Sequence, residues 1–324
     1  MAIDLLSIQP HKVSRDLSGY ITYIYGAPKV GKTTLASQTP KPLLLAFERG
    51  YNALPGVMAQ DITSWSEMKQ VVRELKKPEV KTTFSTICID TVDIAATLCD
   101  KYVCAQHDVD TISQIPYGQG WGMLKREFEE VFRTITQLGY AVFFISHAKD
   151  KVFKREDGTE YNQIVPTVAT TYNSIVENMA DIYGYMHQIR TDNGSKVVIT
   201  LRSADGSVSS GGRFKYIASE IDSDYAALVQ ALNDAIDKEA EATGGKYVTD
   251  ERAVVVQREI KPYTELVEEF QTITKKLMVE RGADFATRIT AIVEKHLGKG
   301  KKVSECTDRQ AEVIDLIVNE LKAL

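Results

Sequence analysis

One stretch near the start of the chain, Tyr20 to Ser37, restricts the possible folds more than any other. It reads YITYIYGAPKVGKTTLAS, a segment rich in β-branched and aromatic residues followed by a loop with two glycines and the start of a helix. Residues 26–33 match the pattern G-x-x-x-x-G-K-[ST] at every defined position. A strand, this loop and a helix in that order predict a backbone cradle for the phosphates of a nucleotide.

The residues of this loop predict how a nucleoside triphosphate and Mg²⁺ would be held. Gly26 and Gly31 let the backbone turn so that successive N–H groups point inward. Lys32 is expected to reach the β- and γ-phosphates, and the Thr33 hydroxyl is expected to bind Mg²⁺. The predicted nucleotide-binding residues are Gly26, Ala27, Pro28, Lys29, Val30, Gly31, Lys32, Thr33 and Thr34.

The composition is that of a soluble globular protein with one large domain or two smaller ones. Of the 324 residues, 44% are hydrophobic and 26% are charged. The net charge of −5 excludes a uniformly basic DNA-coating protein but permits a local basic site. No apolar run approaches roughly 18 residues and the N-terminus lacks the apolar core of a signal peptide, so we expect a cytoplasmic protein with no membrane partner.

Strands and helices alternate along the first three quarters of the chain. Such alternation indicates an α/β domain with a mostly parallel sheet, whose ligands bind beyond the carboxyl ends of the strands. Gly26, Glu48, Asp90 and His147 all follow predicted strands. The expected strands are 20–25, 42–47, 85–90, 140–145, 182–189, 196–202 and 213–217, and the expected helices are 64–77, a helix capped by Thr91 that runs to 106, 124–138, 171–179 and 225–236.

After Gly245 the sequence changes to helical patterns, apart from a possible strand at 254–257. We therefore expect an N-terminal arm (1–19), an α/β core (20–242), a linker (243–251) and a small helical C-terminal module (252–324). A basic loop near the end of one of these helices is expected either to contact nucleic acid or to complement a helix C-terminus, and we favour the second interpretation. Its residues are Lys295, Lys299, Lys301 and Lys302.

Asp90 is the expected second ligand for the metal. It follows the apolar strand Thr86-Ile87-Cys88-Ile89, the form of a Walker B acid, which would hold the Mg²⁺ water shell opposite Thr33. A buried strand that ends in a carboxylate, downstream of a phosphate loop, favours this role over that of an ordinary surface aspartate.

Together with Lys32 and Asp90, several stretches resemble the RecA-like ATPase core over roughly residues 18–240. They are LLLAFERGYNAL, ICIDTVDIAATL, AVFFISHAKDK and NMADIYGYM. They are most similar to the compact phage nucleotide-binding and single-strand annealing proteins of the Sak type. The resemblance implies a RecA-like P-loop fold, ATP and Mg²⁺ as cofactors, and ATP-dependent binding of single-stranded DNA for annealing or strand pairing. It also implies a homo-oligomer or filament, a possible single-strand-binding protein as partner, and the bacterial host cytoplasm if the chain is phage-encoded.

Two polar residues acquire roles through this resemblance. Glu48 lies where RecA-like ATPases place the glutamate that polarises the attacking water, and the other interpretation is a capping or surface glutamate. His147 lies where the family has a polar residue that contacts the γ-phosphate and relays the nucleotide state to the next DNA-binding loop. RecA itself has a glutamine at that position, so the histidine is a departure, and a core or surface histidine stays open as the alternative.

Two irregular segments correspond in position to the DNA loops of RecA-like proteins. Residues 107–121 offer Tyr117 and Trp121, whose rings are suited to stacking on unpaired bases. Residues 148–166, expected as a loop or a small hairpin around Asp157-Gly158, offer positive charge for a phosphate backbone. That charge comes from Lys149, Lys151, Lys154 and Arg155. Without the resemblance, these residues are typical of a hydrophobic anchor and a solvated charged face.

Arg213 and Lys215 resemble the paired basic residues that RecA-like subunits extend into the nucleotide site of a neighbour, which would couple hydrolysis to assembly. Exposed residues of a short strand are the equally good alternative.

Two other functions remain as alternatives to a DNA-binding ATPase. One is a P-loop kinase for a small acceptor, against which residues 148–166 contain a single arginine, Arg155, where a lid rich in arginine is needed. The other is a nucleotide-dependent binding module or recombination mediator without significant catalysis.

Overall fold

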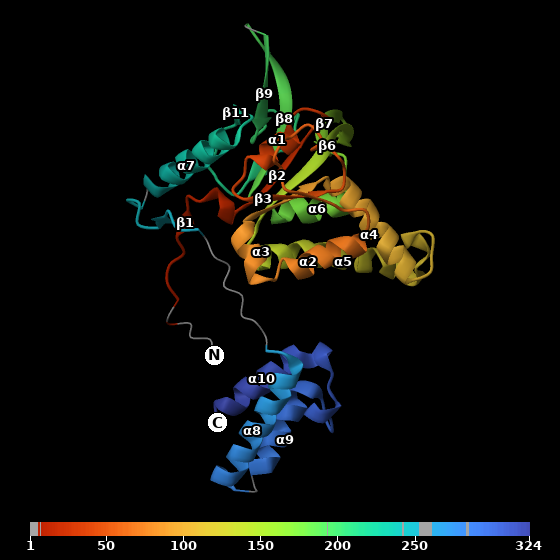
Figure 1. The fold of residues 1–324 in the computed structure, drawn as a ribbon, viewed down its shortest axis with the longest axis vertical. Coiled ribbons are helices and arrows are strands. Elements are labelled where there is room, and N and C mark those ends of the chain that lie inside the picture. Colours follow the sequence, from red (N-terminus) through yellow and green to blue (C-terminus); the bar gives the residue numbers. More distant parts are fainter. Residues whose placement is uncertain (1–5, 7, 193, 242, 253–260, 283–284) are drawn as a thin grey trace. The chain divides into compact units, whose positions relative to one another are not determined.

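The computed structural model describes residues 6, 8–192, 194–241, 243–252, 261–282 and 285–324 (Figure 1). The chain divides into two compact units. One contains Pro10–Val256, and the other contains Gln257–Leu324 together with Met1–Gln9. The possible strand at 254–257 lies outside the described residues.

The larger unit is built on a sheet whose central strands are all parallel. In spatial order these are β4, β3, β5, β6, β2 and β8. Four further strands pair antiparallel with a neighbour: β7 with β6, β9 and β10 with β8, and β11 with β9. The central bounds are β2 (Ile21–Gly26), β3 (Pro42–Ala46), β4 (Ala59–Asp61), β5 (Thr86–Asp90), β6 (Ala141–Lys154) and β8 (Ile182–Thr191). The others are β7 (Glu160–Pro166), β9 (Gly194–Thr200), β10 (Gly211–Gly212) and β11 (Glu220–Asp222). The expected α/β fold with a mostly parallel sheet is confirmed.

Helices cover both faces of this sheet because successive strand residues point to opposite sides. Tyr23 and Tyr25 face one hydrophobic core with α2, α4, α5 and α6, while Ile24 faces a second core with α1 and α7 (Figure 1). The helices are α1 (Lys32–Ser37), α2 (Trp65–Glu74), α3 (Pro78–Thr83), α4 (Val92–Gln106), α5 (Gln119–Gln137), α6 (Thr170–Met179) and α7 (Tyr225–Glu241).

Two hairpins extend from this sheet, and β6 in the first is longer than expected from the sequence. The strand expected at 140–145 continues as β6 to Lys154 and pairs with β7, so residues 148–166 form a hairpin. Likewise β8 pairs with β2 only as far as Met186, opposite Gly26, and then runs on beside β9. Both hairpins thus start at the carboxyl edge of the parallel sheet, where the phosphate loop begins.

Three local expectations were wrong. The helix expected at 64–77 ends at Glu74, and Pro78 begins a separate helix, α3, since proline fits the first helical position where no N–H partner is needed. Residues 213–217 form no strand, and the short strands in this part of the chain are β10 at Gly211–Gly212 and β11 at Glu220–Asp222. Trp121 lies inside α5, which starts at Gln119 rather than near Leu124.

The segments expected as an N-terminal arm and a linker meet in a two-stranded parallel sheet. In it β1 (Val13–Ser14) pairs with β12 (Val248–Thr249). Arg252 donates hydrogen bonds to the backbone carbonyls of Ser18 and Gly139 at 2.9 and 2.7 Å. These contacts hold both segments against the larger unit.

The described residues of the smaller unit form three α-helices around a hydrophobic core, which includes Leu266, Ile292, Ile314 and Leu321. The helices are α8 (Tyr263–Arg281), α9 (Phe285–Leu297) and α10 (Ala311–Lys322). Over the described part of the chain, we find no helix with the length and apolar character needed to cross a membrane.

Candidate functional site

The phosphate loop leaves the sheet at Gly26, the last residue of β2. Only glycine fits there, because a Cβ atom would lie 2.2 Å from the carbonyl oxygen of Met186 on the neighbouring strand. Gly31 has φ 109°, a left-handed backbone conformation that favours glycine, and it immediately precedes α1. The loop therefore points the N-terminus of α1 toward the space that it encloses.

Lys32 is buried at the centre of this loop, with a side chain that folds back over it. Its Nζ atom donates hydrogen bonds to the carbonyl oxygens of Gly26 and Ala27, both at 2.8 Å. Burial lowers the pKa of Lys32, and the charges of Asp90 and Glu48 partly oppose that effect. An anionic ligand would supply the counter-charge that these two carbonyl groups only partly replace.

Thr33 and Asp90 form a pair that fits a magnesium site. The Thr33 hydroxyl donates to Asp90 Oδ2 at 2.7 Å, so one hydroxyl and one carboxylate oxygen converge on the same point. Burial raises the pKa of Asp90, whereas the hydrogen bond from Thr33 lowers it. A divalent cation prefers such oxygen ligands and would relieve the cost of the buried carboxylate.

Gly50 closes over this pair and was not anticipated from the sequence. A Cβ atom at Gly50 would lie 3.2 Å from Thr33 Oγ1 and 3.4 Å from Asp90 Oδ2. The backbone at Gly50 therefore approaches both proposed ligands, which leaves room for a bound group but little for a side chain. The signal in the sequence was the Glu48-Arg49-Gly50 run directly after β3.

Glu48 is held at the same edge by the end of β5. The carbonyl oxygen of Asp90 accepts hydrogen bonds from the N–H groups of Phe47 and Glu48, at 2.7 and 3.1 Å. Thr91 is the N-cap residue of α4, as the sequence predicted, but its hydroxyl donates to Glu48 Oε1 at 2.8 Å and forms no capping hydrogen bond. Backbone and side-chain contacts from Asp90-Thr91 thus fix both the position and the direction of the glutamate.

His147 faces the carboxylate of Glu48 from β6. Its Nε2 atom lies 3.3 Å from both carboxylate oxygens, and its buried Nδ1 atom has no partner among the described residues. Because a carboxylate oxygen accepts hydrogen bonds, Nε2 is the donor in this contact. A buried polar atom without a partner, as Nδ1 is among the described residues, calls for a functional explanation.

A further carboxylate, Asp93, joins this site to the β6–β7 hairpin. Asp93 Oδ2 accepts a hydrogen bond from the backbone N–H of His147 at 3.3 Å, and Oδ1 accepts one from the Thr167 hydroxyl. Thr167 follows β7 directly and its own N–H donates to the carbonyl oxygen of His147 at 2.9 Å. Sequence reasoning missed both Asp93 and Thr167 because nothing local connects residues 74 positions apart.

The β6–β7 hairpin combines aromatic rings with positive charge on one face. Phe153 and Tyr161 stack with ring centroids 5.6 Å apart. The Lys151 ammonium lies 4.7 Å from the first ring and the Arg155 guanidinium 4.8 Å from the second. Strand alternation puts Lys154 on the opposite face, so the predicted basic residues are divided between two faces.

Lys149 lies at the base of this hairpin, where its Nζ atom donates to the carbonyl oxygen of Thr167 at 3.0 Å. The predicted aromatic residues lie elsewhere. Tyr117 is 96% exposed and Trp121 is 53% exposed. No hydrogen bond or ring contact links either of them to the hairpin within the described residues.

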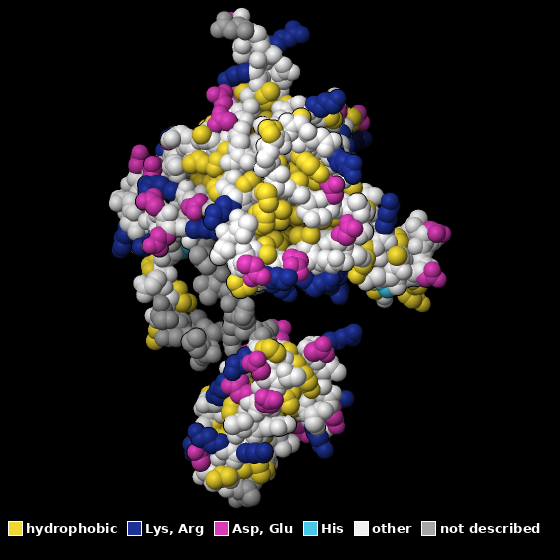
Figure 2. Space-filling view, viewed as in Figure 1, with side chains coloured by type: hydrophobic (Ala, Val, Ile, Leu, Met, Phe, Trp, Pro, Cys, Tyr) yellow, Lys and Arg dark blue, Asp and Glu magenta, His cyan; other side chains and the backbone are white. Residues whose placement is uncertain are grey.

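A second hairpin, β8–β9, projects from the same edge and was not singled out from the sequence. Tyr185 and His187 stack on it with ring centroids 4.7 Å apart. Figure 2 shows Lys and Arg side chains around its projecting end, where the strands carry Arg190 and Lys196. Lys196 is paired with Asp222 at 3.0 Å.

Arg213 and Lys215 lie at the opposite edge of the sheet from the phosphate loop. Arg213 pairs with Asp181 at 3.3 Å, and Asp181 precedes β8 at the edge where Ile21 begins β2. Lys215 lies over the ring of Tyr216, 4.8 Å from its centroid. Neither side chain reaches the nucleotide loop of its own chain.

The fold and site together define a P-loop nucleoside triphosphatase. The phosphate loop follows β2, the acid Asp90 is the last residue of β5, and β6 lies between these two strands. A family model described as an AAA domain matches residues 18–213. The chain therefore belongs to this family of P-loop ATPases.

The comparisons also found a relative and a solved structure. The SPbeta prophage-derived uncharacterized protein YorG of Bacillus subtilis (strain 168) is 32% identical over 338 aligned positions, which cover 100% of this chain and 99% of the relative. The crystal structure of the RadB recombinase is similar at 16% identity and a TM-score of 0.34, over 56% of this chain and 80% of that chain. A likeness of that size says nothing about function, and the strand order defines the fold here.

Proposed function

We propose that this protein is an ATP-dependent, single-stranded-DNA-binding recombination protein of the Sak type, which promotes annealing or strand pairing. The observation that carries the proposal is the single edge at which Lys32, Asp90 and Glu48 meet. His147 lies at the same edge, on the strand that continues into the basic and aromatic β6–β7 hairpin.

The nucleotide site is proposed to work through residues that already contact one another. The loop from Gly26 to Thr34 would hold the phosphates of ATP, with Thr33 and Asp90 holding Mg²⁺, which supplies charge neutralisation when bound. Glu48, oriented by the Thr91 hydroxyl, would accept a proton from the attacking water. Lys32 would exchange its bonds to the Gly26 and Ala27 carbonyl groups for bonds to phosphate oxygens.

His147 is proposed to report the state of the nucleotide to the DNA-binding hairpin. Its ring contacts Glu48 and its backbone N–H contacts Asp93, which in turn binds Thr167 at the end of the hairpin. Movement of Glu48 on hydrolysis would therefore be passed to both ends of the hairpin. The Phe153–Tyr161 face, with Lys151 and Arg155, would stack on bases and neutralise phosphates.

Assembly into an oligomer or filament completes the proposal. Arg213 and Lys215 lie away from their own nucleotide site, so a role for them requires the site of a neighbouring copy. A single-strand-binding protein is the proposed partner on DNA, and Tyr117 and Trp121 are proposed as additional base contacts because their rings are exposed. The phage relative supports action in a bacterial host.

ATP turnover measured with no DNA, with single-stranded DNA and with duplex DNA tests this function. We expect single-stranded DNA to raise turnover at least about fivefold, the lower range of allosteric coupling, and duplex DNA to raise it much less. The same mixtures should anneal complementary oligonucleotides faster with ATP than without it. The proposal would be contradicted if neither form of DNA changed ATP turnover, or if phosphate were transferred to a small acceptor instead of water.

A further inference from the structure

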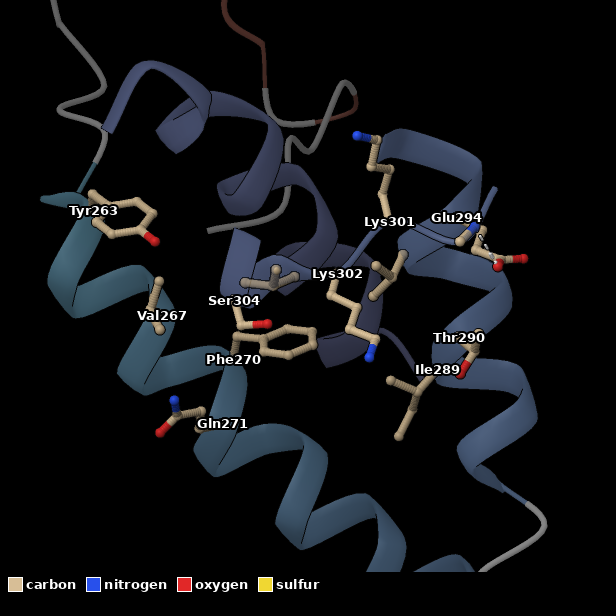
Figure 3. Close-up of a pocket in the computed structure, with 13 residues that line it drawn as sticks. Tyr263, Val267, Phe270, Gln271, Ile289, Thr290, Glu294, Lys301, Lys302 and Ser304 are labelled. Carbon is tan, nitrogen blue, oxygen red and sulfur yellow. Dashed lines mark hydrogen bonds between the residues drawn. The ribbon is translucent and has the colours of Figure 1, made fainter. Parts of the chain in front are cut away.

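The helical module contains a groove that the proposed nucleotide and DNA sites do not use. It lies between α8, α9 and the segment 300–304, with a volume of about 720 Å³ (Figure 3). Clefts of roughly 300–1,000 Å³ are typical of ligand sites. The groove is therefore large enough to hold several side chains of a bound partner.

The walls of the groove are apolar. Val267 and Phe270 line it from α8, Ile289 and Val293 line it from α9, and Val303 lines it from the segment that follows. The last three are buried, whereas Val267 and Phe270 remain half-exposed. Two helices that leave apolar side chains accessible between them form the kind of surface that accepts the apolar face of a third helix.

Positive charge lies beside these walls. The loop after α9 carries Lys299, Lys301 and Lys302, and within the described residues none of the three forms an ion pair. Figure 3 shows the Lys302 side chain extending between Phe270 and Ile289, so its ammonium group lies over apolar surface. Such a group gains most from a carboxylate that arrives with an apolar ligand.

The acidic residue in the lining is bound to the backbone of the same loop. Glu294 Oε1 accepts a hydrogen bond from the backbone N–H of Gly300 at 2.8 Å, drawn as a dashed line in Figure 3. That bond uses the carboxylate to hold the basic loop beside the groove. Lys301 and Lys302 both line the groove, and Figure 3 shows the Lys302 side chain directed into it and that of Lys301 extending away from Phe270 and Ile289, at the rim.

We propose that this groove binds a short amphipathic helix of a partner protein, with large aliphatic side chains on one face and carboxylates beside them. The aliphatic side chains would fill the space between Phe270 and Ile289, and the carboxylates would pair with Lys301 and Lys302. Nucleic acid fits the groove less well, because its walls are mostly aliphatic and offer few ring faces for bases. The groove would therefore recruit a protein to the ATPase while leaving its nucleotide site free.

Fluorescence anisotropy with the full-length chain tests this site. The probe is a labelled helical peptide of about 16 residues, long enough to hold helix on a surface, with leucine at i, i+3, i+4 and i+7 and glutamate at most other positions. Two matched peptides replace leucine by serine or glutamate by lysine. We expect saturable binding of the first peptide and at least tenfold weaker binding of the other two.

Charge-reversal variants locate the binding. The double variant Lys301→Glu/Lys302→Glu should lower the affinity for the leucine–glutamate peptide at least tenfold. Lys275→Glu, on α8 outside the groove lining, should leave that affinity within twofold of the wild type. Gln271→Trp, which adds bulk at an exposed position of the groove wall, should also weaken binding without removing a buried side chain. ATP turnover should stay unchanged in all three variants, which separates this site from the proposed catalytic one.

Two results would overturn the proposal. One is binding that is equally strong with the serine peptide or the lysine peptide, or that survives Lys301→Glu/Lys302→Glu. The other is a loss of oligonucleotide binding in that double variant with no effect on the peptide, which would make the loop a nucleic-acid contact.

Discussion

The Thr167 hydroxyl donates a hydrogen bond to the carboxylate of Asp93, on which the backbone N–H of His147 also converges. Asp93 lies in the first turn of α4, and Thr167 follows β7 at the base of the basic hairpin. The carboxylate therefore couples the strand that holds His147 to the return strand of the hairpin, at the point where both leave the sheet.

This link predicts the behaviour of Thr167→Val. The variant removes one hydrogen bond to Asp93 and keeps the shape of the side chain, so basal ATP turnover should stay within twofold. Stimulation by single-stranded DNA should fall about fivefold or more, in line with a coupling free energy of roughly 1–3 kcal/mol. Thr170→Val, at the exposed start of α6, is the control. Equal stimulation in the wild type and Thr167→Val would show that the Thr167–Asp93 hydrogen bond does not couple DNA binding to ATP turnover.

The two faces of the hairpin predict unequal roles for its basic residues. Lys151→Ala, on the Phe153–Tyr161 face, should weaken binding to single-stranded DNA and reduce the slope of log K against log salt by about 0.7, the value per phosphate contact. Lys154→Ala, on the opposite face, should change the slope much less. Titrations at several salt concentrations measure both, with Lys238→Ala on α7 as a distant control. Identical slopes for all three variants would show that the Phe153–Tyr161 face of the hairpin does not contact the DNA.

The buried Asp90 predicts a pH-dependent stability difference. Burial raises the pKa of this carboxyl group, so between about pH 4 and that raised pKa the folded chain binds more protons than the unfolded chain, and the contribution of Asp90 to stability falls as pH rises through this range. Asp90→Asn removes that cost and keeps an acceptor for Thr33. Without nucleotide, the variant should melt at a higher temperature than the wild type near pH 8, with a smaller difference near pH 4. A difference independent of pH would contradict this interpretation.

The close approach of Met186 predicts the effect of Gly26→Ala. The added Cβ would meet the Met186 carbonyl oxygen at 2.2 Å and displace the loop. Saturating ATP and Mg²⁺ should raise the melting temperature of the wild type, since a ligand at 100 times its Kd adds roughly 2.7 kcal/mol, but not that of the variant. Gly122→Ala is the matched control, because its Cβ meets nothing within 4 Å and an alanine there should stabilise α5 by about 0.5–1 kcal/mol.

The sequence was sufficient to predict the parallel sheet and the edge at which the candidate site lies. Strand ends are visible in a sequence because an apolar run stops at a polar residue, as at Asp90, and parallel strands bring such ends to one edge. The same argument gave the position of Glu48 and His147 without any contact being known.

Strand ends do not predict which side chains contact one another after folding. Thr91 has the sequence of a helix cap, yet its hydroxyl turns to Glu48, because tertiary contact replaced the local bond. Asp93 and Thr167 meet only after the chain has folded. Arg213 was placed on a strand from its pattern, whereas its ion pair with Asp181 fixes it at the far edge. Long-range partners of this kind carry no signal in a single sequence.

The most direct test of the account is ATP binding and ATP turnover measured on Glu48→Gln. The amide keeps an acceptor for the Thr91 hydroxyl but is a far weaker base than the carboxylate, so turnover should fall by about 10²–10⁴, the usual contribution of a general base. ATP affinity should stay within about threefold of the wild type, because Lys32, Thr33 and Asp90 are unchanged. Unchanged turnover, or an equal loss of binding and turnover, would contradict the role of Glu48.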